Sequence, residues 1–231
     1  MCNVMPFPDL AERVAEVRER IAAAVARGGH GQQVTLVAVT KTYGPDAVAA
    51  AWELGIGDIG ENKVQEALSK MGAVAVPVRW HLIGHLQRNK AKSVDRFSLV
   101  HSVDSARLAD AVSRVGQDRG APIHVLMQVN VAGEEAKGGL APDEAAVEGE
   151  RWLSLQGLRV EGVMTMAPLD ADERTLRSTF SGARVVRERL AALGHPATEL
   201  SMGMSNDYEI AVEEGATMVR LGTVLFGARH A

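Results

Sequence analysis

Cysteine, aromatic residues and an excess of positive charge are all scarce in this chain of 231 residues. The single cysteine, Cys2, cannot form a disulfide within the chain, so we expect a reducing compartment, the cytoplasm. Aromatic residues make up only 4%, and 25 Lys plus Arg face 29 Asp plus Glu. Proteins that bind nucleic acid usually carry a basic excess and aromatic side chains for stacking, so we expect no nucleic-acid partner.

Long apolar runs are missing as well. No stretch reaches the roughly 18 apolar residues of a membrane helix, and Pro6 and Pro8 lead into a charged helical pattern rather than a secretory signal. The composition, 46% hydrophobic and 23% charged, is typical of a globular protein. We therefore expect one domain over residues 1–231, with a core at about residues 10–229, and no membrane association.

The chain does contain a regular alternation of short apolar segments and helical patterns. Such an alternation favours right-handed strand–helix–strand units around a parallel sheet. Eight strands are expected, at residues 34–40, 58–60, 78–82, 98–102, 123–130, 158–164, 198–201 and 218–222. Helices are expected at residues 9–25, 45–54, 63–71, 89–94, 106–117, 143–153, 173–193 and 207–214.

Eight strands of this kind indicate a closed (β/α)8 barrel. Too few residues follow the eighth strand for a further helix, so we expect the helix at residues 9–25 to complete the outer ring. An open, doubly wound sheet is the alternative, because the second and seventh strands are short.

The first candidate for chemistry is Lys41, which directly follows the first strand. Active sites of barrels lie at the carboxyl ends of the strands, and a partly buried lysine there can act as a nucleophilic amine. The alternative is a lysine that extends from the end of the strand into water.

A second candidate is the segment at residues 201–207, Ser-Met-Gly-Met-Ser-Asn-Asp, between the seventh strand and a helix. Ser205 is expected as the N-cap of that helix, which explains the residue by itself. The same geometry offers N–H groups to a phosphate.

The third candidate is Arg220, a charged residue within the apolar eighth strand. A buried arginine needs an ion-pair partner or a ligand, and both readings stay open here. Gly222 and Thr223 follow, so that phosphate donors lie after strands seven and eight, the common phosphate site of this barrel.

A lysine after the first strand together with such a phosphate site predicts a phosphorylated aldehyde as ligand. Pyridoxal 5′-phosphate (PLP) is one such molecule. Spacing alone does not exclude a sugar-phosphate aldolase.

At this level of detail the sequence resembles the PLP homeostasis protein family, which is similar to the N-terminal domain of alanine racemase. The resemblance extends over about residues 10–229. The motifs that carry it are Val-Ala-Val-Thr-Lys-Thr at 37–42, Gly-Glu-Asn-Lys-Val-Gln-Glu at 60–66, Trp-His-Leu-Ile-Gly-His-Leu-Gln-Arg-Asn-Lys at 80–90, Gly-Val-Met-Thr-Met at 162–166, Ser-Met-Gly-Met-Ser at 201–205, and Arg-Leu-Gly-Thr at 220–223 with Phe-Gly at 226–227.

The resemblance implies the barrel of type III PLP proteins, with Lys41 holding PLP as an internal aldimine. It implies phosphate contacts for Ser205, Gly222 and Thr223 and a contact from Arg220 to the pyridine nitrogen. Asn62 and Met204 are the remaining cofactor-binding residues that we expect. The family is thought to buffer and deliver PLP, so we expect no strong catalytic turnover, with PLP-dependent apoenzymes as candidate partners.

Two enzymatic alternatives remain, an amino-acid racemase that uses PLP and a Schiff-base aldolase without a cofactor. Racemases with this barrel take their second base from an additional β domain and a partner subunit. No such domain is visible in the sequence, so we expect a monomeric carrier. His81 and His85 lack a nearby ligand cluster and predict no metal site, and the roles of these histidines and of Lys137 stay open.

Overall fold

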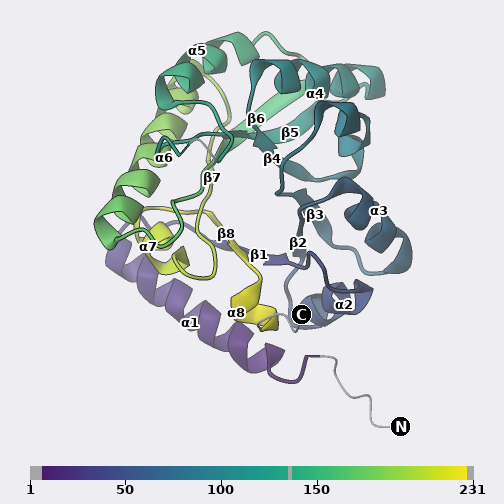
Figure 1. Ribbon diagram of the computed structural model, residues 1–231, viewed down its shortest axis with the longest axis vertical. Helices are drawn as coiled ribbons and strands as arrows, with labels where there is room; N and C mark the ends of the chain where they lie inside the picture. The colour runs from purple at the N-terminus through teal and green to yellow at the C-terminus, as the bar shows by residue number, and fades with distance from the viewer. Residues whose placement is uncertain (1–6, 135–136, 228–231) are drawn as a thin grey trace.

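The computed structural model describes residues 7–134 and 137–227, and eight parallel strands in it close into a barrel. Each strand pairs with the next along the chain, and the eighth pairs with the first. Figure 1 shows the strands around the centre and the helices outside them. The predicted closed barrel is confirmed, and the open sheet is wrong. The strands are β1 Thr35–Val39, β2 Asp58–Glu61, β3 Arg79–Leu82, β4 Leu99–Val103, β5 Ile123–Gln128, β6 Leu158–Met164, β7 Glu199–Ser201 and β8 Met218–Leu221.

Helical segments connect these strands on the outside, at or near the predicted positions. Residues 88–96 form a 3₁₀ helix rather than the expected α-helix. Only Ala91 and Val94 of it are buried, and their spacing of three matches the three residues per turn of a 3₁₀ helix. The helices are α1 Leu10–Gly28, α2 Pro45–Glu53, α3 Val64–Ala73, η1 Arg88–Arg96, α4 Ala106–Arg119, α5 Pro142–Trp152, α6 Glu173–Leu193, α7 Tyr208–Glu213 and α8 Thr223–Phe226.

The long helix α1 packs against the last two helices, α7 and α8, along the outer ring (Figure 1). Its buried residues lie at helical intervals on one face. This arrangement confirms the prediction that the N-terminal helix completes the ring. Contrary to expectation, one helical turn, α8, follows β8. The buried residues of α1 are Leu10, Val14, Val17, Ile21 and Ala24.

The interior of the barrel is separate from the core between strands and helices. Five apolar residues, Val37, Leu99, Leu126, Met164 and Met218, form the interior cluster. Buried polar side chains of β2, β3, β4, β7 and β8 also lie in the interior, where they bond to one another across the barrel. The structure contains no helix within residues 7–134 and 137–227 that is long and apolar enough to cross a membrane.

Candidate functional site

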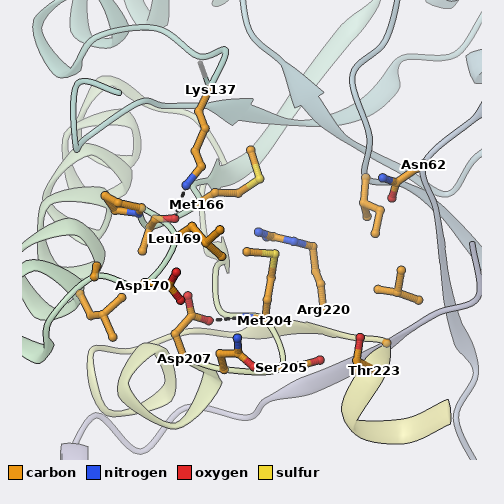
Figure 2. A pocket seen from close by; sticks show the side chains of 18 of the residues that line it. Asn62, Lys137, Met166, Leu169, Asp170, Met204, Ser205, Asp207, Arg220 and Thr223 are labelled. Atoms are coloured by element: carbon orange, nitrogen blue, oxygen red, sulfur yellow. Dashed lines mark hydrogen bonds between the residues drawn. The ribbon is translucent and has the colours of Figure 1, made fainter. Parts of the chain in front are cut away.

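A cavity of about 730 Å³ lies where the strands end, and all seven candidate residues line it. Lys41 follows β1, Asn62 follows β2, and Met204 and Ser205 follow β7. Figure 2 shows the side chains around this cavity. The residues that sequence analysis selected from four separate segments are therefore neighbours, which local spacing alone could not establish. The complete set is Lys41, Asn62, Met204, Ser205, Arg220, Gly222 and Thr223.

A strained turn presents Lys41. The next residue, Thr42, has φ of 71°, the left-handed region that β-branched residues rarely adopt. The backbone N–H of Thr42 donates to Oε1 of Glu66 at 2.5 Å, and the N–H of Tyr43 donates to the carbonyl of Thr40 at 3.0 Å. These bonds stabilise the turn, and half-buried Lys41 lies in the cavity wall as a result.

Behind this turn lies a buried ion-pair cluster centred on Lys70. Its Nζ donates to Oε1 of Glu61 at 2.6 Å, to Oε1 of Glu66 at 2.9 Å and to the carbonyl of Thr40 at 2.7 Å. Burial raises the pKa of Glu61, although hydrogen bonds from Lys70 and Thr40 oppose the shift. Burial acts on the pKa of Glu66 in the same direction, but its hydrogen bonds from Lys70 and Thr42 lower the pKa overall. The cluster ties β1, β2 and α3 together under Lys41.

Asn62 has its place because Gly84 passes close to it. A Cβ atom at position 84 would lie 2.4 Å from the carbonyl oxygen of Asn62 and 2.7 Å from its Cα. Contacts this short with backbone atoms exclude any larger residue unless the chain moves. Gly84 therefore allows the loop after β3 to pack on Asn62, which lines the cavity from the end of β2.

The segment after β7 folds into a tight turn that brings Ser205 toward β8. Gly203 has φ of 93°, and a Cβ there would lie 2.7 Å from Cβ of Ala211, so the position requires glycine. The N–H of Met204 donates to Oδ1 of Asp207 at 2.6 Å. The N–H of Val224 donates to the hydroxyl of Ser205 at 3.3 Å, which links this turn to α8.

The sequence predicts Ser205 as the N-cap of the helix after β7, and this prediction is wrong. The helix begins at Tyr208 with Asp207 as N-cap, and the side chain of Asp207 bonds Met204 instead of a helix N–H. The hydroxyl of Ser205 consequently points toward α8, on the same side of the cavity as Thr223 (Figure 2). The turn, rather than a helix cap, brings the two hydroxyl side chains together.

Arg220 is buried in the barrel wall and donates hydrogen bonds to three oxygen atoms. Nη1 donates to the carbonyl of Ser201 at 2.7 Å and to its hydroxyl at 2.6 Å, while Nη2 donates to the carbonyl of Thr165 at 3.0 Å. Burial lowers the pKa of Arg220 to about 10, and nearby Asp207 opposes the shift. The ion pair that the sequence left open is absent within the described residues, since no carboxylate lies within 4.0 Å. Three of its five N–H groups are used by these bonds, so two remain for a ligand in the cavity.

The cavity wall also contains Met166 and Leu169, which the sequence did not single out, and Lys137, whose role the sequence left open. Met166 and Leu169 follow β6, and Lys137 follows β5. Their position just after a strand is the sequence feature from which a place in the cavity wall could have been predicted. Lys137 bonds the carbonyl of Ala167 and pairs with Glu134 at 2.9 Å, and Figure 2 shows its side chain directed to the cavity. The bond from Lys137 to Ala167 joins the segments after β5 and β6, a long-range contact that the glycines around Lys137 do not predict.

The two histidines of the β3 segment have different surroundings. His81 is buried in the barrel, whereas His85 is exposed and lies 3.2 Å from Asp104. Within the part of the chain that the structure describes, no group of three His, Cys, Asp or Glu side chains could hold a metal ion.

Comparison with known proteins identifies the family. The family model for the N-terminal domain of alanine racemase matches residues 13–230. The pyridoxal phosphate homeostasis protein of Aquifex aeolicus is 40% identical, over 94% of this chain and 97% of its own. This chain belongs to the pyridoxal phosphate homeostasis protein family.

Two more comparisons support membership in this family. The pyridoxal phosphate homeostasis protein of Pseudomonas aeruginosa is 41% identical, over 95% of this chain and 96% of its own. The solved structure of PipY from Synechococcus elongatus with PLP bound has a TM-score of 0.84 and 35% identity, and covers 94% of this chain and 100% of its own. The resemblance that the sequence motifs indicated is thereby confirmed for the family and the fold.

Proposed function

We propose that this protein binds PLP in the cavity and takes part in PLP homeostasis, including delivery to PLP-dependent apoenzymes. The observation that carries the proposal is the convergence of all seven candidate residues on one cavity in a member of this family. The volume of about 730 Å³ lies within the roughly 300–1,000 Å³ of small-molecule sites. We further propose that it acts as a monomer in the cytoplasm.

The donors beside α8 fit a phosphate group. Ser205 accepts a hydrogen bond from Val224, so its own hydroxyl hydrogen can be donated to a phosphate oxygen. Thr223 adds a second hydroxyl, and Gly222 lines the wall without a side chain between them. The carboxylate of Asp207 is occupied by the N–H of Met204, which reduces its repulsion of an anion.

Other residues of the cavity wall fit the aldehyde and the ring. When bound, PLP supplies an aldehyde that condenses with a lysine amine and a ring nitrogen that accepts a hydrogen bond. Lys41 offers the amine from the end of β1. Arg220 offers N–H groups from β8, since a guanidinium only donates hydrogen bonds. Asn62 and Met204 complete the wall.

We assign the protein the role of a carrier rather than that of a racemase. Relatives from Aquifex aeolicus and Pseudomonas aeruginosa match nearly end to end and bear the name of PLP homeostasis proteins. A carrier must release its ligand, and the cavity lies at the mouth of the barrel, where the strands end.

Two measurements test the proposal. First, the protein mixed with PLP and then separated from free PLP should keep a visible absorption band, which an aldolase without cofactor lacks. Second, the loaded protein should reactivate a PLP-dependent apoenzyme in the presence of a scavenger that removes free PLP. Reactivation that the scavenger abolishes completely would reduce delivery to release into solution, and absence of the band would contradict PLP binding itself.

A further inference from the structure

A chain of buried hydrogen bonds runs through the barrel interior from Arg220 to the opposite end. From Arg220 Nη1 it continues through the hydroxyl of Ser201 at 2.6 Å to Nδ1 of His101 at 2.8 Å. Nε2 of His101 lies 2.9 Å from Nδ1 of His81, and Nε2 of His81 lies 2.8 Å from Oδ1 of Asp58. Asp58 is the first residue of β2, so the chain ends near the amino ends of the strands.

At the Asp58 end of the chain, the direction of hydrogen-bond donation is fixed. Oδ2 of Asp58 accepts from Nη2 of Arg79 at 2.6 Å. Burial would raise the pKa of Asp58, but the hydrogen bonds from His81 and Arg79 lower it overall, so the group is a carboxylate at neutral pH. A carboxylate only accepts, so Nε2 of His81 must carry a hydrogen and donate it.

At the Arg220 end of the chain, the hydrogen bonds are donated in the same direction, toward Asp58. Arg220 only donates, so the oxygen of Ser201 accepts from it, and the hydrogen of the Ser201 hydroxyl needs another acceptor. Among the described residues that acceptor is Nδ1 of His101. His101 then carries its hydrogen on Nε2 and donates it to Nδ1 of His81. Every donor in the chain has an acceptor only when both histidines are neutral with hydrogen on Nε2.

If His81 were protonated on both ring nitrogens, one donor in the chain of hydrogen bonds would lose its acceptor. His81 would donate from Nδ1 to His101, which would then donate from its own Nδ1 to Ser201. The hydroxyl oxygen of Ser201 would then accept two hydrogen bonds, and the hydroxyl hydrogen of Ser201 would have no acceptor among the described residues. Burial also lowers the pKa of His101 well below its ordinary range, with smaller effects of His81 and Arg220 in the same direction.

We propose that His101 is a positioning residue for Arg220, and that His81 and Asp58 fix its tautomer from the other end of the barrel. The hydroxyl of Ser201, held by His101, and the carbonyls of Ser201 and Thr165 present three acceptors that set the plane of the guanidinium. Two further N–H groups of Arg220, on Nε and Nη2, have no acceptor among the described residues and are directed by this plane. The inference rests on the proposed function, in which those groups face the PLP ring.

The first test needs neither a variant nor PLP. Nitrogen-15 NMR of the unloaded protein, labelled at its imidazole rings, should show His81 and His101 with a protonated Nε2 and a bare Nδ1 at neutral pH. A hydrogen on Nδ1 of His101 overturns the inference. The exposed His124, which lies on the outside of the barrel at 2.6 Å from Glu161, takes no part in these hydrogen bonds and serves as the reference signal.

The second test compares two substitutions of His101. Both lose the bond to His81, but His101→Asn keeps an acceptor near the position of Nδ1, whereas His101→Leu removes it. We expect His101→Leu to weaken PLP binding about fivefold, as the loss of one hydrogen bond predicts, and to shift the absorption maximum of the bound ligand. His101→Asn should restore both properties, and His124→Asn should alter neither.

The outcomes separate this inference from the proposed function. If the unmodified protein shows no PLP band, the proposed function fails, while the NMR tautomers still decide whether the chain exists. If PLP binds and both His101 variants show the same spectrum and affinity as the unmodified protein, positioning by His101 is overturned. If His101→Leu does not fold, the tautomers of the unmodified protein and the spectrum of His101→Asn still decide the matter.

Discussion

The backbone N–H of Met204 donates to Oδ1 of Asp207 at 2.6 Å, and this bond closes the turn that carries Ser205. A carboxylate beside a proposed phosphate site would ordinarily repel the ligand. Here one carboxylate oxygen of Asp207 accepts the N–H of Met204, so Asp207 stabilises the turn. Burial raises the pKa of Asp207 above its ordinary value despite this bond and the nearby charge of Arg220.

Replacement of Asp207 should therefore weaken PLP binding according to the lost hydrogen bond, not the lost charge. Asp207→Ala removes the acceptor for Met204, and we expect a loss of about tenfold in PLP affinity, since a bond to a charged group contributes roughly 1.5–3 kcal/mol. Asp207→Asn keeps an acceptor oxygen and should stay within about threefold of the unmodified protein. Equal losses for the two variants, measured by titration of the absorption band, would mean that the charge itself matters.

Lys41→Ala should abolish the visible absorption band of bound PLP and leave the melting temperature nearly unchanged. The residue is half-buried at the end of β1, so its removal leaves no cavity in the core. Lys137→Ala is the matched control, because Lys137 lines the same cavity and carries the same amine. Borohydride reduction and peptide mapping should find the label on Lys41. A label mainly on Lys137 would refute the assignment.

Ser205→Ala and Thr223→Val should each weaken the binding of PLP by about tenfold, because each removes a hydroxyl donor to a charged phosphate. Pyridoxal has no phosphate, so its affinity should hardly change. Titration of both ligands against both variants checks this difference. Equal losses for pyridoxal and PLP would show that the substitutions act through the fold of the turn, where Ser205 also accepts from Val224.

A different prediction concerns the stability of the outer ring in acid. Glu213 of α7 pairs with Arg27 of α1 at 2.5 Å and with Arg177 of α6 at 2.6 Å. Burial would raise the pKa of Glu213, but the hydrogen bonds from Arg177 and Arg27 lower it overall. A lowered pKa in the folded state contributes stability above the ordinary glutamate pKa of about 4.3, and this contribution is lost as the pH falls through the folded-state value.

Glu213→Gln should thus reduce the free energy of unfolding by about 1 kcal/mol at neutral pH and have a smaller effect in acid. Denaturant unfolding at pH 7 and at pH 3 measures both values. Glu53→Gln is the control, since the described residues give Glu53 no ion pair and it lies exposed at the end of α2. A deficit that is as large at pH 3 as at pH 7 would exclude the ion pairs as its cause.

The sequence predicted the barrel because each strand and helix carries its own local signal, such as the helical spacing of α1. Local signals failed where contacts between distant segments decide the geometry. Asp207 displaced Ser205 as N-cap because the turn after β7 packs on α8. The bond between His101 and Ser201 joins residues 100 positions apart, and neither residue stood out by itself. Lys137 lies in the cavity wall and bonds Ala167, 30 positions away, which its local sequence does not predict.

The protonation state of Arg220 predicts whether the pyridine nitrogen of bound PLP carries a proton. The pKa of Arg220, lowered by burial to about 10, still lies about three units above neutral pH, so the guanidinium is charged and donates. A donor that faces the pyridine nitrogen requires that nitrogen to accept, so the nitrogen should be unprotonated. Nitrogen-15 NMR of labelled PLP in the unmodified protein should show this state. A pyridinium signal would contradict the role proposed for Arg220.

Two substitutions of Arg220 separate charge from hydrogen bonding. Arg220→Glu would set a carboxylate against the carbonyls of Ser201 and Thr165, which now accept from the guanidinium, and we expect it to destabilise the fold by about 3–5 kcal/mol. Arg220→Gln keeps donors for these carbonyls and can turn its oxygen to the cavity, so it should fold and allow protonation of the ring nitrogen. The NMR signal should then titrate near neutral pH in Arg220→Gln. A nitrogen that stays unprotonated down to pH 5 in this variant would show that residues other than Arg220 control it.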